Sequence, residues 1–477
     1  MTESYRLSLT QKTMFLAVLS AIFLAAMDQT VVATALPTIA RDLHALAHLP
    51  WVITAYLLSS TVSLPIYGKL GDLMGRKKVL SFAVGFFLLG SILSGLAWNL
   101  QSLVLFRALQ GLGGGGILVT AIASISDFIP LEQRGKYQGL VGAAFGLATL
   151  IGPFLGGLVV QHLGWRWIFY INIPFGIFSL AIIQWAFPKV EHGRIPFDAV
   201  GALALFFGLT ALVLLVELGG NSVWRWPLGL VLLLCLWGLF VQSPRHREPI
   251  LPLVFFRHKT FSASVLVSFF VGAAMLGSIS FLPAYYQAVR GFSPTQSGLE
   301  MLFLLVGMLL TSVFSGRWIS KHQNFRIFPL LGTLFTALAL WLLSHLGTTT
   351  PFWRIDGALI LLGVGLGSTM QVMVLSAQWA LPHRHLGVAT STVSLFRSMG
   401  GTLGVAGFGA VFTHFVGNSS PTGRAVPQHI VSAMHWDFGI AAALTLVAFV
   451  AAWNLEDLST LMGRRKAGEN AKDPTGH

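Results

Sequence analysis

The chain has 477 residues, of which 55% are hydrophobic and only 10% are charged, and its mean hydropathy is +0.74. This composition excludes the soluble globular classes, which need far more polar surface, and indicates a polytopic membrane protein. The net charge of +13 does not indicate a nucleic-acid surface, because the basic residues lie singly or in small groups between apolar runs. With a single cysteine, Cys235, the chain cannot form an intrachain disulfide.

Apolar segments long enough to cross a bilayer, which takes about 20 residues, recur along the whole chain. No cleavage-type small-residue site follows the first segment, so we expect it to be a retained span and not a signal peptide. The sequence predicts an all-α fold with fourteen spans, over residues 14–36, 50–70, 79–98, 102–126, 137–160, 167–187, 198–218, 225–243, 261–286, 296–316, 327–346, 355–379, 386–415 and 437–454.

The basic residues predict the orientation of these spans. With both termini in the cytoplasm, the inner segments hold 22 of the 30 basic residues and the outer segments hold six. This asymmetry is what the positive-inside rule expects, and it favours cytoplasmic termini. Tryptophans close to predicted span ends are expected to anchor the chain at the bilayer interface: Trp51, Trp98, Trp165, Trp226 and Trp353.

Residues 68–80, GKLGDLMGRKKVL, form a short charged segment between the second and third apolar runs. Gly68, Gly71 and Gly75 would let two helix ends approach closely. Asp72 could accept hydrogen bonds from a helix N-terminus or pair with a guanidinium such as that of Arg76. A turn that only kept a loop in the cytoplasm would need the basic residues but not this spacing. The pattern resembles the loop between spans 2 and 3 of the major facilitator superfamily.

The resemblance implies a gate on the cytoplasmic side. Asp72 and Arg76 would form it together with Asp127, at the inner end of the fourth span, and Arg134, at the start of the fifth. The alternative is that this segment serves only as a topology signal.

Asp28 lies inside the first apolar span, where an ionised carboxylate is costly unless it faces a cavity or a partner. Its surroundings, LAAMDQTVVATALPTIA, in which Pro37 is expected to end the helix, resemble the first-span motif of fourteen-span proton-driven multidrug exporters. Ala33 stands where that family often has Asn, so a role of that Asn does not carry over. The resemblance implies that Asp28 carries the coupling proton. A paired Asp28 that serves only packing is the alternative.

Arg107, in LVLFRALQGLGGG, resembles the fourth-span motif R-x-x-q-G of the same family. The resemblance implies a basic group on the cavity side that tunes Asp28 or takes part in proton transfer. A nearby guanidinium favours the ionised carboxylate, whereas burial favours the neutral acid, so a conformational change could switch between them. The alternative is that Arg107 only hydrogen-bonds backbone carbonyls at a helix break.

The fifth apolar span carries a pattern of small residues four apart, which makes one face of a helix smooth, and a proline that permits a kink. The pattern resembles the antiporter signature of the superfamily, which is associated with exporters. It is followed by GWRWIFYINIPFG, residues 164–176, a string typical of the fourteen-span drug exporters. The resemblance implies a hinge in this span, formed by Gly146, Gly152, Pro153, Gly156 and Gly157.

An internal repeat predicts the domain organisation. Arg134, Gly135 and Gly139 are echoed by Arg384 and Gly387, and GRWISKH from Gly316 looks like a decayed copy of residues 68–80 without its Asp. We therefore expect a six-span bundle over residues 1–190, two extra spans over 191–250, a second six-span bundle over 251–460 and a cytoplasmic tail over 461–477. Repeats of this kind place the substrate site near the midplane between the halves.

Cofactor chemistry finds no support in the sequence. Gly111, Gly113 and Gly116 match G-x-G-x-x-G, but they lie inside a span with no preceding strand, so close helix packing is the better interpretation. There is no phosphate-binding G-x-x-x-x-G-K-[ST] motif, so ATP-driven pumping is not indicated. Paired catalytic acids or a His pair within the spans are lacking, so we expect no enzyme activity, no metal and no cofactor.

Together, the motifs predict a proton-coupled antiporter of the inner membrane, functional as a monomer, that exports small amphipathic or cationic drug-like compounds. Its expected partners are a small-molecule substrate, protons and the lipid bilayer, without nucleic acid. Export of an endogenous metabolite such as a sugar, amino acid or siderophore remains the alternative, and a membrane-embedded enzyme is a more remote one. Residues that could line a substrate cavity, although packing against lipid or a neighbouring helix would also suit most of them, are Arg397, Phe145, Tyr285 and Met370.

Overall fold

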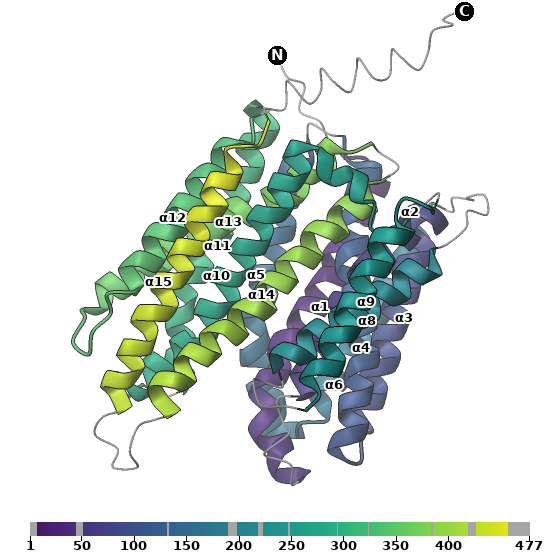
Figure 1. Ribbon diagram of the computed structural model, residues 1–477. Coiled ribbons are helices and arrows are strands. Elements are labelled where there is room, and N and C mark those ends of the chain that lie inside the picture. The colour runs from purple at the N-terminus through teal and green to yellow at the C-terminus, as the bar shows by residue number, and fades with distance from the viewer. Residues whose placement is uncertain are drawn as a thin grey trace, which may run out of the picture. The chain divides into compact units, whose positions relative to one another are not determined.

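The computed structural model describes residues 7–43, 51–130, 133–188, 198–217, 223–246, 249–292, 294–322, 324–382, 385–417 and 426–456. Within these residues the chain is almost entirely helical and has no β-strand (Figure 1). The elements are α1 (Leu9–Asp42), α2 (Trp51–Met74), α3 (Arg76–Gly95), α4 (Leu100–Phe128), α5 (Arg134–Leu163), α6 (Trp167–Tyr170), α7 (Asn172–Ala186), α8 (Ala199–Glu217), α9 (Arg225–Gln242), the 3₁₀ turn η3 (Leu253–Arg257), α10 (Lys259–Ala288), α11 (Pro294–His322), α12 (Ile327–Leu343), α13 (Phe352–Ala380), α14 (Leu386–Gly417) and α15 (Val426–Ala452).

The expectation of an all-helical protein with many spans is confirmed. Each predicted apolar segment overlaps one long helix, except that the sixth is covered by α6 and α7 together. Among the described residues, ten helices are long and apolar enough to cross a membrane. Three further apolar stretches are shorter, Phe154–Leu163, Ala199–Leu215 and Ile327–Leu343. The protein is therefore a multi-pass membrane protein, whereas the count of fourteen spans and the cytoplasmic termini stay predictions.

Two local expectations were wrong. Helix α1 does not end at Pro37 but continues to Asp42, because in a membrane protein neighbouring helices can compensate for the backbone group that a proline leaves unpaired. Trp165 is no interfacial anchor: it is 2% exposed, and its indole Nε1–H donates a hydrogen bond of 2.9 Å to Asp42 Oδ2. Trp98, Trp226 and Trp353 are exposed, as interfacial anchors would be.

The chain folds into two compact units. Unit 1 comprises Met1–Leu131, Ala143–Leu253 and Arg384–Leu395, and unit 2 comprises Glu132–Gly142, Val254–His383 and Phe396–His477. Helices α8 and α9 belong to unit 1, where α8 packs against α2. The first turns of α5 lie in unit 2 and those of α14 in unit 1, because each packs on helices distant in sequence. The predicted division at residues 190 and 250 thus groups the chain differently, and the predicted tail, 461–477, lies outside the described residues.

Helix pairings repeat between the units. In unit 1, α4 packs against α2 and α3, and α7 packs against α1 and α3. In unit 2, α13 packs against α11 and α12, and α15 packs against α10 and α12. The glycines of α4 enable this packing: a Cβ on Gly113 would lie 2.3 Å from the Phe87 backbone nitrogen on α3, and one on Gly111 would lie 2.3 Å from the Tyr56 carbonyl oxygen on α2. The interpretation of this glycine run as close helix packing is confirmed.

Candidate functional site

Asp28 and Arg107 form an ion pair in the interior of unit 1. Arg107 Nη1 lies 2.7 Å from Asp28 Oδ2, and the two side chains are 1% and 0% exposed, respectively. Asp28 is near the middle of α1, and Arg107 lies at the start of the third turn of α4. An unpaired carboxylate at this depth would cost several kcal/mol, and the Arg107 guanidinium supplies the ionic partner that offsets this cost. The sequence expectation that Asp28 has a buried partner is consistent with this contact.

Two amide side chains complete the coordination of Asp28. Gln110 Nε2 and Asn172 Nδ2 both donate to Asp28 Oδ1, at 2.9 and 2.8 Å. Both also donate to the Ser91 hydroxyl, which in turn donates to the Phe169 carbonyl. The carboxylate therefore accepts three hydrogen bonds from side chains that are themselves buried. Hydrogen bonds of this kind favour the ionised form of a carboxyl group.

Arg107 is positioned by more than Asp28. Its Nη1 also donates to Gln110 Oε1 at 2.7 Å, and its Nε makes a long hydrogen bond of 3.4 Å to the Val52 carbonyl. The guanidinium stacks 4.2 Å from the centroid of the Tyr56 ring. Delocalised, weakly hydrated guanidinium suits such a desolvated, stacked position better than an ammonium would. The network therefore connects side chains and backbone groups of five helices, α1, α2, α3, α4 and α7.

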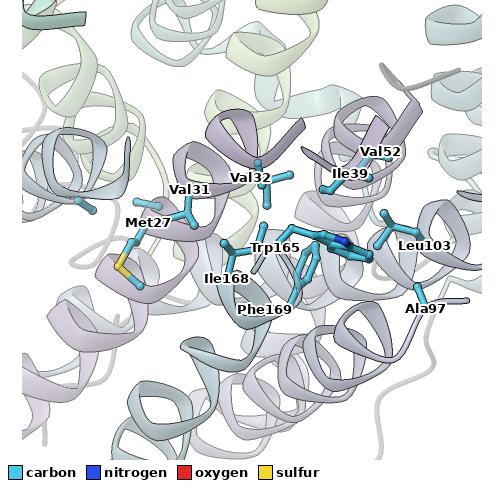
Figure 2. Packing of buried hydrophobic residues seen from close by; sticks show 13 residues of the cluster. Met27, Val31, Val32, Ile39, Val52, Ala97, Leu103, Trp165, Ile168 and Phe169 are labelled. Atoms are coloured by element: carbon cyan, nitrogen blue, oxygen red, sulfur yellow. The ribbon is translucent and has the colours of Figure 1, made fainter. Parts of the chain in front are cut away.

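A cluster of buried apolar side chains borders this network. Phe169 contributes both its ring, 5.8 Å from the Arg107 guanidinium carbon, and the carbonyl that accepts from Ser91. The Trp165 and Phe169 rings meet edge to face with their centroids 6.3 Å apart. Figure 2 shows these two rings among residues of α1, α2 and α4; the buried members are Ala26, Met27, Val31, Val32, Ala35, Ile39, Val52, Ala97, Leu103, Ala148, Trp165, Ile168 and Phe169.

The sequence analysis missed four residues of this site: Ser91, Gln110, Asn172 and Tyr56. A signal existed for two of them, because Gln110 is the polar residue of the R-x-x-q-G motif and Asn172 lies within the 164–176 string. Gln110 follows Arg107 by three residues and so lies on the same face of α4. Asn172 begins α7, directly after the short α6. Ser91 and Tyr56 had no distinguishing pattern.

A second charged cluster lies where α2 ends and α3 begins. Arg76 forms an ion pair with Asp72, and its Nε lies 3.4 Å from Asp127 Oδ2. Asp72 also accepts hydrogen bonds from the backbone N–H groups of Gly387 and Val388, at 3.0 and 3.1 Å. These two N–H groups belong to the first turn of α14, where the helix has unpaired donors and a partial positive charge. Both interactions expected of Asp72 from the sequence are present.

The three glycines of residues 68–80 have different structural roles. A Cβ on Gly68 would lie 2.5 Å from Ser391 Oγ and 2.7 Å from the Gly387 carbonyl, so only glycine lets α2 approach α14 this closely. Gly75 has a φ of +88°, a backbone conformation that interrupts the helix and so separates α2 from α3. A Cβ on Gly71 would collide with the Arg76 guanidinium.

The fourth predicted gate residue is Arg134. It is buried at the start of α5, whose first turns belong to unit 2, whereas Asp72, Arg76 and Asp127 belong to unit 1. Three of the four predicted gate residues are therefore brought together by the structure. Their role as a gate stays a prediction.

Among the α5 hinge candidates, one close contact stands out. A Cβ on Gly152 would lie 1.9 Å from Thr30 Oγ1, two residues after Asp28 on α1. Gly157 has open space around it, while Gly146 and Gly156 are buried. Helix α5 continues through position 153, and the Pro153 side chain lies outside the described part of the chain. The structure therefore supports close packing of α5 on α1, while the hinge stays a prediction.

The cavity candidates are distributed over both units. Phe145 lies in unit 1 and packs against the apolar cluster of Figure 2. Tyr285 is buried in unit 2, and its hydroxyl donates a 2.8 Å hydrogen bond to the Gly347 carbonyl. Met370 is 8% exposed on α13, and Arg397 is half-buried on α14 with its carbonyl against Gly272. A role of these four in substrate binding stays a prediction.

The internal repeat identifies the positions of unit 2 that correspond to the Asp28 network. On α4, Gly111 meets the Tyr56 carbonyl, and on α13, Gly363 meets the Leu304 carbonyl. These matching contacts make Leu359 the counterpart of Arg107.

On the neighbouring helices, Gly152 approaches the Met27 carbonyl and Gly404 approaches the Ala273 carbonyl, at 3.3 and 2.2 Å from an added Cβ. Asp28 therefore corresponds to Ala274, the residue after Ala273. The two positions of unit 2 that correspond to Arg107 and Asp28 are therefore apolar, Leu359 and Ala274.

The fold and its motifs agree with known proteins. The chain is 39% identical over 423 residues to an uncharacterized MFS-type transporter of Mycobacterium tuberculosis, covering 87% of this chain but only 61% of that relative, so it spans about three fifths of that length. It is 37% identical to the multidrug transporter protein MdtP of Bacillus subtilis, over 83% of this chain and 74% of MdtP. Multidrug resistance protein 3 of Bacillus subtilis is 34% identical, over 85% of this chain and 80% of that protein.

Solved structures show the same fold at low sequence identity. The human organic anion transporter MFSD10 (TETRAN) superposes with a TM-score of 0.67 at 16% identity, over 93% of this chain and 99% of that one. The proton:xylose symporter XylE superposes with a TM-score of 0.67 at 15% identity, over 94% and 98%. The sequence pattern described as the Major Facilitator Superfamily matches residues 18–405. The chain belongs to the major facilitator superfamily.

Proposed function

We propose that this transporter is a proton-coupled antiporter that exports small amphipathic or cationic compounds across the inner membrane, with its termini in the cytoplasm. The observation that carries the proposal is the Asp28–Arg107 ion pair, buried among apolar side chains in unit 1. The names of two relatives, MdtP and Multidrug resistance protein 3, support a drug-like substrate. The buried acid supports proton coupling, because ionisable groups inside membrane spans are rare and commonly serve proton transfer.

The proton step follows from the hydrogen bonds of Asp28. In the described arrangement the Asp28 carboxyl group accepts hydrogen bonds from Arg107, Gln110 and Asn172. A proton that arrives on Asp28 from outside removes its charge, so Arg107 loses its ionic partner inside an apolar surrounding. Compensation requires water to enter or the end of the guanidinium to turn away from Asp28, and either change opens the contact between these two side chains. When the next substrate binds from the cytoplasm, the proton leaves on that side and the ion pair forms again.

Arg107 would tune this step through its second hydrogen bonds. The Gln110 amide, the Val52 carbonyl and the Tyr56 ring still hold the guanidinium when Asp28 is neutral. These contacts make protonation reversible, because Arg107 can return to the carboxylate without refolding of its helix. The Asp72–Arg76–Asp127 cluster would then serve as the cytoplasmic gate that opens and closes with each cycle.

The decisive experiment is transport by Asp28→Asn in vesicles. Purified protein in liposomes is given an imposed pH gradient, and accumulation of a fluorescent lipophilic cation such as ethidium is recorded. We expect Asp28→Asn to reduce gradient-driven accumulation at least tenfold, because asparagine cannot carry a proton. Asp42→Asn is the matched control: it lies on the same helix, is exposed and accepts only the Trp165 indole bond among the described contacts. Wild-type accumulation by Asp28→Asn would refute the assignment.

A double variant separates coupling from structure. Arg107→Gln alone leaves a buried carboxylate without its cation, at a cost of roughly 3–5 kcal/mol. Asp28→Asn with Arg107→Gln removes both charges, so its thermal stability should recover toward that of the wild type. If the ion pair served packing only, this double variant would also regain transport. We expect it to stay inactive under a pH gradient.

A further inference from the structure

An acidic side chain lies inside the last helix of unit 2. Asp437 belongs to α15, whose stretch from Gln428 to Ala452 is long and apolar enough to cross a membrane. Asp437 follows Gln428 by nine positions, which places it roughly 13 Å into this stretch at about 1.5 Å per residue. The span expected over residues 437–454 put Asp437 at the edge of the membrane, whereas the helix begins eleven residues earlier, at Val426.

Neither carboxyl oxygen of Asp437 has a hydrogen-bond partner within the described part of the chain. The residue is 1% exposed, and both Oδ1 and Oδ2 are buried without a donor there. No basic side chain of the described residues forms an ion pair with it. Asp28, by contrast, accepts from Arg107, Gln110 and Asn172. The two buried acids therefore have opposite surroundings.

The face of α15 that carries Asp437 is otherwise apolar. Ala433, Met434 and Ala441 lie three or four positions away, so they share this face, and each is 0% exposed. A residue that served only packing here would be better apolar as well, because the acid gains no hydrogen bond in return for its burial. Packing alone therefore does not explain an aspartate at this position.

The basic groups of the neighbouring helices lie at the far end of α15. This helix packs against α10 and α12 (Figure 1). Arg326, which precedes α12, donates a 3.1 Å hydrogen bond to the Trp453 carbonyl. Lys259 is the first residue of α10, and the residue after it hydrogen-bonds Glu456. Trp453 follows Asp437 by sixteen positions, or roughly 24 Å along a helix. Neither cation therefore reaches Asp437.

The other titratable groups of these helices do not balance a charge on Asp437 either. Helix α12 has no titratable side chain, and α10 and α15 add Tyr285, Tyr286, His429 and His435. The two tyrosines are uncharged at neutral pH. His429 lies eight positions before Asp437, more than two helical turns away. His435 lies two positions before it, on another face of the helix, and its Nε2 donates to the Leu346 carbonyl at 2.8 Å.

These surroundings favour the neutral acid. An ionised carboxylate without a donor or a cation loses its hydration and regains nothing, whereas a neutral carboxyl group loses far less on burial. Inside a membrane span the difference is larger still, because lipid offers no polar group in place of water. The contacts of Asp437 are therefore those of a carboxyl group that carries a proton.

We propose that Asp437 is a proton-binding site of unit 2, which holds a proton in the described arrangement and releases it when water reaches this face of α15. Release leaves the carboxylate, and the proton passes to a water molecule. Because the face is packed against other helices, hydration requires α15 to separate locally from α10 or α12. The site does not rest on the function proposed for Asp28, since it lies in the other unit and concerns proton binding at equilibrium.

Infrared difference spectroscopy of the purified full chain tests the bound proton. At mildly acidic pH, the wild type should show a C=O band of a protonated carboxylic acid that Asp437→Asn lacks, because asparagine has no carboxyl group. Asp42→Asn, which removes an exposed carboxylate, should keep this band. Asp28→Asn should keep it too, so the result stands whether or not Asp28 couples transport. Persistence of the band in Asp437→Asn, or its loss in Asp28→Asn, would overturn the proposal.

The pH dependence of thermal stability is an independent measurement. Asparagine has the size of the protonated acid and stays neutral, so Asp437→Asn should match the wild type at acidic pH. As the pH rises, the unfolded wild-type chain ionises this carboxyl group in water, whereas the folded chain favours the proton. The thermal midpoint of the wild type should therefore fall more steeply with pH than that of Asp437→Asn. Parallel pH profiles, or failure of Asp437→Asn to fold at acidic pH, would contradict the site.

Discussion

At the end of α2, the backbone of Gly68 lies against the first turn of α14, and at the end of α11, the backbone of Gly316 lies against the first turn of α5. A Cβ on Gly68 would come within 2.7 Å of the Gly387 carbonyl, and one on Gly316 within 2.3 Å of the Gly135 carbonyl. The first contact lies within unit 1 and the second within unit 2. We call them the α2–α14 junction and the α11–α5 junction.

The two junctions differ in the group that caps the helix. Four residues after Gly68, Asp72 accepts from the backbone N–H groups of Gly387 and Val388. Four residues after Gly316, the Ser320 hydroxyl accepts from the Lys136 backbone N–H at 2.8 Å. The repeat has therefore kept the geometry and replaced a carboxylate by a hydroxyl.

This replacement changes the strength and the chemistry of the junction. A carboxylate at a helix N-terminus gains from both hydrogen bonds and the helix dipole, whereas a hydroxyl makes one neutral hydrogen bond. Asp72 is also tied to Arg76, which reaches Asp127 on α4. The α2–α14 junction thus joins four helix ends through charge, while the contacts described at the α11–α5 junction are close packing and the Ser320 hydrogen bond. We infer that the charged junction is the stronger of the two.

The largest losses of stability and transport are expected from substitution of the glycine that both junctions contain. Gly68→Val and Gly316→Val place a Cβ against backbone atoms of a neighbouring helix, which cannot move aside without displacing that helix. We expect each to lower thermal stability strongly and to reduce transport at least tenfold. Gly157→Ala, at a glycine with open space around it, is the matched control and should be neutral. Tolerance of valine at either site would show that the contact is not needed.

A smaller loss of stability is expected from substitution of Asp72, the acid that only the α2–α14 junction has at this position. Asp72→Asn keeps one acceptor but loses the charge that pairs with Arg76 and the α14 dipole, and we expect it to cost roughly 1–3 kcal/mol. The thermal midpoint and the transport rate of this variant are compared with those of the wild type. If Asp72 and Arg76 act together, Asp72→Asn combined with Arg76→Gln should cost less than the sum of the single changes. Unchanged turnover in Asp72→Asn would reduce this segment to a topology signal.

The smallest effect is expected at Ser320. Ser320→Ala removes one neutral hydrogen bond to the first turn of α5, at a cost of about 0.5–1.5 kcal/mol. Its loss of thermal stability should be below that of Asp72→Asn, measured in the same detergent. A larger loss for Ser320→Ala would reverse the ranking of the junctions.

The sequence alone predicted most of what is local. Hydropathy placed a helix at every apolar segment, because the bilayer imposes a minimum length of apolar residues on each span. The spacing of Gly68, Asp72 and Gly75 predicted close helix ends and a helix-capping acid, since few other residue types satisfy a positive φ or a helix N-terminus. The same reasoning identified Asp28 and Arg107, because charges inside apolar spans are rare.

Tertiary structure alone decided which of these residues meet. Ser91, Gln110 and Asn172 are ordinary polar residues in the sequence, and they become a coordination shell only because α3, α4 and α7 converge on Asp28. Helix periodicity determines which face of one helix is polar, but the partner across the interface depends on the packing of all helices in a unit. The sequence identified the unusual charged residues inside the spans, whereas the tertiary structure decided which side chains they contact.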